Sequence, residues 1–76
     1  MVNTELLNEK IELSGLKPSF IIKTLGITPN SFYRKKTNQM FFKAAEVYVL
    51  CDLLKITDEE EKTKIFYPES LLNSQL

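Results

Sequence analysis

Apolar residues recur at the three- and four-residue spacing of α-helices in five separate parts of the chain. In the first part, Leu7 and Ile11 fall on one face, and acidic residues fill the other. The segments expected to be helical are residues 4–14, 18–25, 29–36, 43–55 and 58–66. No segment alternates between apolar and polar residues in the way that predicts a strand. The pattern therefore predicts an all-α fold of five short helices around one core.

Glycine and proline mark where these helices begin and end. Gly15 and Gly26 follow the first two helices, where glycine readily takes the left-handed conformation that closes a helix. Pro18 fits best at the first position of a helix. Thr28 followed by Pro29 repeats this start signal, with a hydroxyl that can cap the next helix. A single short turn built on Gly26 therefore separates the second and third helices.

The third helix differs from the others because its only strongly apolar residue is Phe32. A helix with so narrow an apolar stripe exposes most of its surface. The spacing that a helix-turn-helix requires is present in four residues: Ile21, Gly26, Ile27 and Phe32. In that arrangement the polar face of the third helix is free to enter a DNA major groove, which is wide enough for one helix.

Two further predictions concern the second half of the chain. Phe41 and Phe42 lie in a short apolar run that we place in a loop, where they are expected to be core or loop anchors. Exposure of one of them would suggest a dimer interface. Thr57 and Glu60 have capping-box spacing and are expected to begin the fifth helix.

Length and composition indicate one folded domain. The chain has 76 residues, of which 43% are hydrophobic. Pro68 is expected to end the ordered part, which gives a domain of residues 1–68 and a tail of residues 69–76. No apolar run approaches the ~20 residues needed to span a bilayer, and no signal peptide is expected, so the expected location is cytoplasmic.

Acidic residues are absent between Leu13 and Ala45, although the net charge of the whole chain is zero. This acid-free stretch contains six basic residues: Lys17, Lys23, Arg34, Lys35, Lys36 and Lys43. A basic segment flanked by acidic ones indicates a polyanionic partner even where the total charge does not. For Arg34 to Lys36 the alternative is a solvated helix end, because cations near a helix C-terminus are favourable without any function.

The chain lacks the residue types that most catalytic and metal sites need. Cys51 is the only cysteine, and there is no histidine. A structural zinc site needs about four Cys or His ligands, and a catalytic thiol needs a histidine partner. Cys51 is therefore expected to be a small core residue. We expect no enzyme activity, no metal and no cofactor.

Five short segments, taken together in this order, carry a family resemblance. They are Ser14-Gly15-Leu16-Lys17, Leu25-Gly26-Ile27-Thr28, Ser31-Phe32-Tyr33, Leu50-Cys51-Asp52-Leu53-Leu54 and Ile56-Thr57-Asp58-Glu59-Glu60. Over about residues 5–66 the chain resembles the Cro/repressor (XRE-type) helix-turn-helix family of phage and bacterial regulators. The resemblance implies a compact five-helix bundle of the lambda-repressor-like type. It also implies a small phage or mobile-element repressor that binds double-stranded DNA sequence-specifically, as a homodimer at least on DNA.

The resemblance further implies which residues contact DNA. The base-contacting positions are Pro29, Asn30, Ser31, Tyr33 and Arg34. The phosphate-contacting positions are Lys17, Ser19, Thr28, Lys35, Lys36 and Lys43. The chemistry of two of these residues agrees with their positions, because Asn can form paired hydrogen bonds with adenine and Arg with guanine.

Three departures from the family pattern leave a second function open. Ile22 stands where the family usually has a small residue, and Pro18 stands where a polar side chain commonly bonds phosphate. A third-helix position that is usually apolar holds Lys35 or Lys36. Together with the zero net charge, these features motivate an alternative, in which the chain is a protein-binding modulator (an antirepressor) that grips another regulator and has little affinity for DNA.

Overall fold

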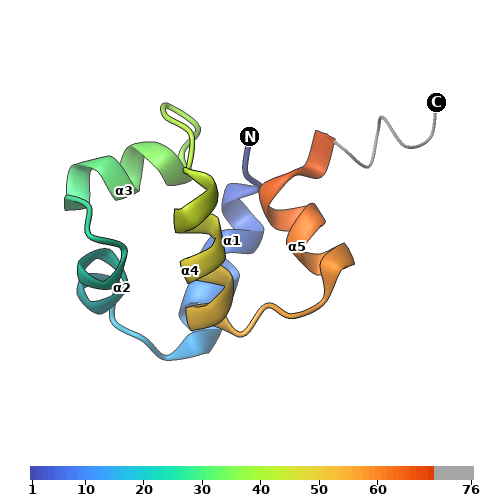
Figure 1. Cartoon of the computed structure of the whole chain (residues 1–76), viewed down its shortest axis with the longest axis horizontal. Coiled ribbons are helices and arrows are strands. Elements are labelled where there is room, and N and C mark those ends of the chain that lie inside the picture. The colour runs from blue at the N-terminus through green and yellow to red at the C-terminus, as the bar shows by residue number, and fades with distance from the viewer. Residues whose placement is uncertain (70–76) are drawn as a thin grey trace.

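A computed structural model of the chain describes residues 1–69, which form five helices and no strand (Figure 1). The helices are α1 (Thr4–Ser14), α2 (Pro18–Leu25), α3 (Pro29–Lys36), α4 (Ala44–Leu54) and α5 (Glu59–Phe66). The predicted all-α class and the five helices are confirmed. The first three helices have the predicted bounds, whereas α4 and α5 each begin one residue later than predicted, and α4 ends one residue earlier.

The predicted turn chemistry is confirmed for the first three helices. Gly15 and Gly26 close α1 and α2 with φ angles of 72° and 73°, in the left-handed region where only glycine avoids strain. The Thr28 side chain caps α3 by accepting a hydrogen bond of 3.1 Å from the Ser31 amide. These local signals fix the short connection between α2 and α3.

The cap of α5 differs from the prediction. Asp58 precedes the helix, and its carboxylate accepts a hydrogen bond of 3.2 Å from the Glu61 amide. The capping box predicted for Thr57 and Glu60 is therefore wrong by one residue. The same spacing of three separates Asp58 from Glu61, and a carboxylate is also favoured at a helix N-terminus by the helix dipole.

Each helix contributes at least one side chain to a single core. The most deeply buried side chain of each helix, in order, is Leu7, Ile21, Phe32, Leu50 and Ile65. α4 contacts both α1 and α2, while α5 packs on α1 and α3 packs on α2. As a result α2 and α3 lie at one end of the molecule and α5 at the other, with α1 and α4 between them (Figure 1).

The two neighbouring phenylalanines of the loop between α3 and α4 behave differently. The Phe42 ring makes edge-to-face contacts with Phe32 and Phe66, with ring centroids 6.2 Å apart in both pairs. Phe41 is 79% exposed. The loop itself is confirmed, and so is the anchoring role of Phe42, but Phe41 is not a core residue.

The two ends of the described chain lie close together. The amino group of Met1 is 2.8 Å from a carboxylate oxygen of Glu69, and Pro68 and Glu69 are helical. The domain boundary expected at Pro68 stays a prediction. The remainder of the predicted tail lies outside the described residues. None of the helices in residues 1–69 has the length and apolar character that crossing a membrane requires.

Candidate nucleic-acid interface

Most of the residues predicted to contact bases share the outer face of α3. That face consists of Pro29, Asn30, Tyr33 and Arg34, all of them exposed. Their spacing of one, three and four residues places them together on a helix surface. Ser31 is half-buried at the edge of this face, and the opposite face buries Phe32 and Lys35.

The polar side chains of the outer face are free to bind a ligand. Arg34 takes part in no ion pair within residues 1–69. Asn30 is exposed, and its side chain makes no hydrogen bond in this part of the chain. A guanidinium and an amide therefore project from adjacent turns of α3 with their hydrogen-bonding groups unused.

The inner face of α3 is fixed by an ion pair buried in the protein. The Lys35 ammonium lies 2.7 Å and 2.9 Å from the two carboxylate oxygens of Glu46 on α4. The side chain of Glu46 also accepts a hydrogen bond of 2.9 Å from the Lys43 amide at the start of α4. Only 5% of Lys35 and 8% of Glu46 is exposed, so the pair joins α3 to α4 inside the fold.

The environment keeps Glu46 ionised. Burial acts to raise the pKa of its carboxyl. The hydrogen bonds from the Lys35 ammonium and the Lys43 amide, with the charges of both lysines, act in the opposite direction and outweigh burial. The pKa of Glu46 is therefore lower than its ordinary value, and its carboxylate is ionised at neutral pH.

This geometry corrects one predicted contact. Lys35 was expected to contact phosphate, but its ammonium is buried and already bonded by a carboxylate. Moving it to the surface would leave Glu46 buried without its cation, which is strongly unfavourable. Lys35 therefore lies on the buried face of α3, and its ammonium is not available to a phosphate group.

Lys36 is directed toward α1 instead of the outer face of α3. Its ammonium donates a hydrogen bond of 3.0 Å to the side-chain oxygen of Asn8 and lies 5.2 Å from the centre of the Phe32 ring. The residue is half-buried. A phosphate contact by Lys36 would compete with both interactions.

The N-terminal segment holds the C-terminal end of α3. The Thr4 hydroxyl donates a hydrogen bond to the Lys36 carbonyl. Val2 and Asn38 form a pair of bonds, in which the Val2 amide donates to the Asn38 side chain at 2.8 Å and the Asn38 side chain donates to the Val2 carbonyl at 3.0 Å. Asn38 has a φ of 66°, in the left-handed region that asparagine adopts more readily than most residues. α3 is thus fixed from α1, α4 and the N-terminus, while its outer face stays bare.

The other residues predicted to contact phosphate are exposed: Lys17, Ser19, Thr28 and Lys43. Three of them are N-cap residues, since Lys17 precedes α2, Thr28 precedes α3 and Lys43 precedes α4. The first turn of a helix carries a partial positive charge and unpaired amide groups, so a nearby lysine or hydroxyl adds to an environment that favours anions.

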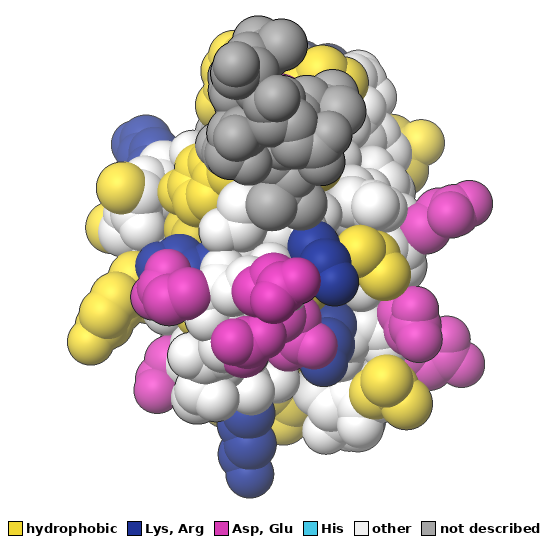
Figure 2. Space-filling view, turned by 90° about the vertical axis from the view of Figure 1, so that its right-hand side faces the viewer, with side chains coloured by type: hydrophobic (Ala, Val, Ile, Leu, Met, Phe, Trp, Pro, Cys, Tyr) yellow, Lys and Arg dark blue, Asp and Glu magenta, His cyan; other side chains and the backbone are white. Residues whose placement is uncertain are grey.

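Charge is separated along the molecule. The acid-free stretch covers α2, α3 and the start of α4, whereas acidic residues lie on α1, α5 and the rest of α4. Seen from the α5 side, Asp and Glu side chains gather around that end of the molecule, with Lys side chains among them (Figure 2). The acidic α5 end lies opposite α2 and α3.

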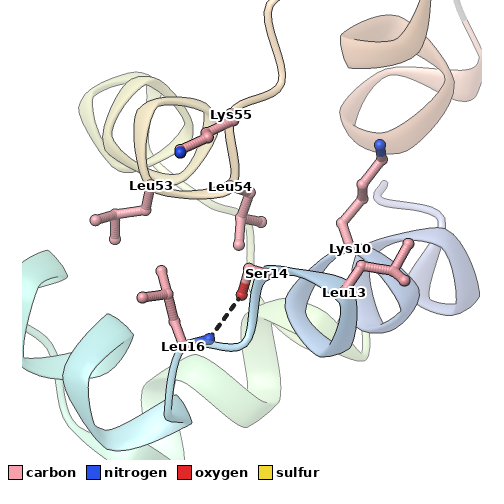
Figure 3. A pocket seen from close by; sticks show the side chains of 7 residues that line it. All are labelled: Lys10, Leu13, Ser14, Leu16, Leu53, Leu54 and Lys55. Carbon is pink, nitrogen blue, oxygen red and sulfur yellow. Dashed lines mark hydrogen bonds between the residues drawn. The ribbon is translucent and has the colours of Figure 1, made fainter.

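A cavity of about 380 Å³ lies away from α3, between the end of α1 and the end of α4 (Figure 3). Its lining residues are Lys10, Leu13, Ser14, Leu16, Leu53, Leu54 and Lys55. The Ser14 hydroxyl oxygen accepts a hydrogen bond of 3.1 Å from the Leu16 amide, which shapes the link from α1 to α2. Lys10 is paired with Glu61 at 2.9 Å. None of these residues is among the predicted DNA contacts.

Comparison of the chain with protein-family models, with curated proteins and with solved structures found no match. The evidence for function therefore lies in the chain itself. Sequence reasoning missed one important residue, Glu46. The available signal was Lys35, which follows Phe32 by three residues and so shares its buried face.

Proposed function

We propose that the chain is a sequence-specific DNA-binding regulator of the Cro/repressor type, in which α2 and α3 act as a helix-turn-helix. The observation that carries the proposal is the contrast within α3. Its inner face is locked to the core through Phe32 and the Lys35–Glu46 pair, while its outer face presents unbonded polar groups to solvent. A rigid helix with a bare polar face suits entry into a major groove.

The outer face supplies the chemistry for reading bases. Arg34 can donate two hydrogen bonds to guanine, and Asn30 can pair with adenine through one donor and one acceptor. Pro29 and Tyr33 add apolar surface, which suits the methyl group of thymine. Each correct paired contact contributes about 1–3 kcal/mol of discrimination against the wrong base.

Phosphate contacts come from a smaller set of residues than the basic stretch contains. Lys35 is neutralised by Glu46, and Lys36 is engaged with Asn8 and Phe32. Lys17 and Lys43 remain the main charged contacts, supported by Ser19 and Thr28. Together with Arg34 they make three available cations per subunit, which gives a log–log salt slope of about −2.7.

Selection of bound sequences from a random DNA pool tests the proposal. The proposal predicts enrichment of a short motif, repeated about one helical turn apart where two copies bind. Affinity for the enriched sequence should fall with salt at the slope given above. Absence of enrichment at low salt, or an affinity independent of salt, would rule out DNA binding of this kind.

A second candidate function is binding to another regulator protein, with little DNA affinity. One structural observation favours it, which is that Phe20 is 50% exposed on the outer side of α2, beside Ser19 and Lys23. An exposed aromatic ring suits a protein partner better than a phosphate backbone. Gel-shift measurements at low salt distinguish the two functions, because the second predicts no shift with random or genomic DNA.

A further inference from the structure

A groove of about 520 Å³ lies between the second half of α4 and the start of α5. It is lined by Tyr48, Cys51, Asp52, Lys55, Ile56, Thr57, Glu59 and Lys62. None of these residues belongs to the outer face of α3. The groove is therefore a separate surface, and its use leaves the proposed DNA contacts free.

The groove has an apolar floor and an exposed aromatic side chain at its edge. Ile56 is buried and Cys51 is half-buried against the core. Burial raises the pKa of the Cys51 thiol, so the floor carries no thiolate at neutral pH. Tyr48 is 76% exposed. A tyrosine exposed next to an apolar floor is the kind of anchor that protein interfaces use.

The charges around the groove are balanced and unpaired. Asp52 and Glu59 supply two carboxylates, and Lys55 and Lys62 supply two ammonium groups. None of the four takes part in an ion pair within residues 1–69, although lysines elsewhere in that range do. An acidic or basic partner would be attracted by one pair of charges and repelled by the other.

A second copy of the same surface avoids this repulsion, because it carries two acidic and two basic residues of its own. In a two-fold interface each surface meets its own copy, so the acids of one subunit can face the bases of the other. We propose that the groove between α4 and α5 is the interface at which two copies of this chain associate, with Tyr48 of each copy against the apolar floor of the other. The proposal stands independently of DNA binding, and it supplies the second subunit that a two-half-site operator requires.

Charge exchange in the groove tests this proposal without DNA. One double variant, Lys55→Glu with Lys62→Glu, makes all four charges acidic, and another, Asp52→Lys with Glu59→Lys, makes them all basic. Sedimentation equilibrium at concentrations up to about 100 µM measures the mass. We expect wild type to form dimers, each double variant to be monomeric through like-charge repulsion, and an equimolar mixture of the two to form heterodimers.

A matched pair of single variants tests the anchor. Tyr48→Ala should weaken self-association at least about tenfold. Phe41 is similarly exposed, at 79%, and its exposure makes it the competing candidate for a dimer interface, but it lies outside the groove. Phe41→Ala should therefore leave self-association unchanged, and weakening by Phe41→Ala in place of Tyr48→Ala would overturn the proposal. Far-UV circular dichroism confirms that each variant is folded. A monomeric wild type, or double variants that do not associate when mixed, would overturn the proposal. Absence of an enriched sequence in the DNA selection would instead overturn the proposed function.

Discussion

The outer and inner faces of α3 each carry a basic residue, but the residue on the outer face is exposed and the residue on the inner face is buried. Arg34 and Lys35 are neighbours in sequence and both are basic, yet Arg34 projects into solvent and Lys35 is buried with Glu46. A run of basic residues therefore does not define a binding surface by itself. The position of each residue around the helix decides whether its charge is available to a ligand or serves the fold.

The largest expected effect comes from breaking the inner face. Glu46→Ala leaves the Lys35 ammonium buried without a counter-charge, which should lower the free energy of unfolding by about 3–5 kcal/mol. The variant also loses the acceptor for the Lys43 amide. Urea denaturation measures the change.

A compensating variant provides the control for this effect. Lys35→Met combined with Glu46→Gln removes both charges and keeps an oxygen for the Lys43 amide. Most of the lost stability should return, because an apolar replacement of a buried pair is often nearly neutral. If Glu46→Ala unfolds in urea like wild type, the inner face is not held by the ion pair.

The same pair predicts how stability depends on pH. In the folded protein the pKa of Glu46 is lower than its ordinary value. In the unfolded chain a glutamate has a pKa of about 4.3. The stabilisation is therefore fully present above that pH and is lost as the pH falls through the lower folded pKa. Wild type should lose more stability than Glu46→Gln between about pH 6 and about pH 3. Urea unfolding monitored by circular dichroism measures both losses. Equal losses would contradict the assignment of this pH dependence to Glu46.

A smaller effect is expected at the two glycines that close α1 and α2. Gly15 and Gly26 have nearly the same positive φ, and an added Cβ would meet no atom within 4 Å at either position. Gly15→Ala and Gly26→Ala should therefore each cost roughly 1–2 kcal/mol through backbone strain alone. Only Gly26→Ala alters the turn before α3, so only that variant should also weaken DNA binding beyond its effect on stability. If the two variants bind DNA with equal affinity, the turn at Gly26 does not contribute to DNA binding.

Local signals in the sequence were sufficient for much of the fold. Glycine, proline and the Thr28 cap act on the residues beside them, and they fix the bounds of α1, α2 and α3. The residues of the outer face of α3 could likewise be inferred, because helical spacing alone groups them.

The remaining features depend on contacts between distant parts of the chain. The partner of Lys35 is set by how α3 packs against α4, and no spacing within α3 reveals it. Phe41 and Phe42 have the same side chain and adjacent positions, and only the path of the loop decides which ring enters the core. The groove between α4 and α5 cannot be recognised from the sequence either, since it forms only where the end of α4 and the start of α5 pack beside each other.

The proposal that the outer face of α3 reads bases, while exposed lysines outside it contact phosphate, is tested most directly by Arg34→Ala beside Lys43→Ala. Fluorescence anisotropy would measure the affinity of both variants for the selected DNA site and for its single-base changes. Arg34→Ala should lose about 1–3 kcal/mol of preference at one base pair and keep wild-type stability, while Lys43→Ala should weaken binding to all sequences alike. Unchanged base preference in Arg34→Ala would contradict the proposal that the outer face of α3 reads DNA.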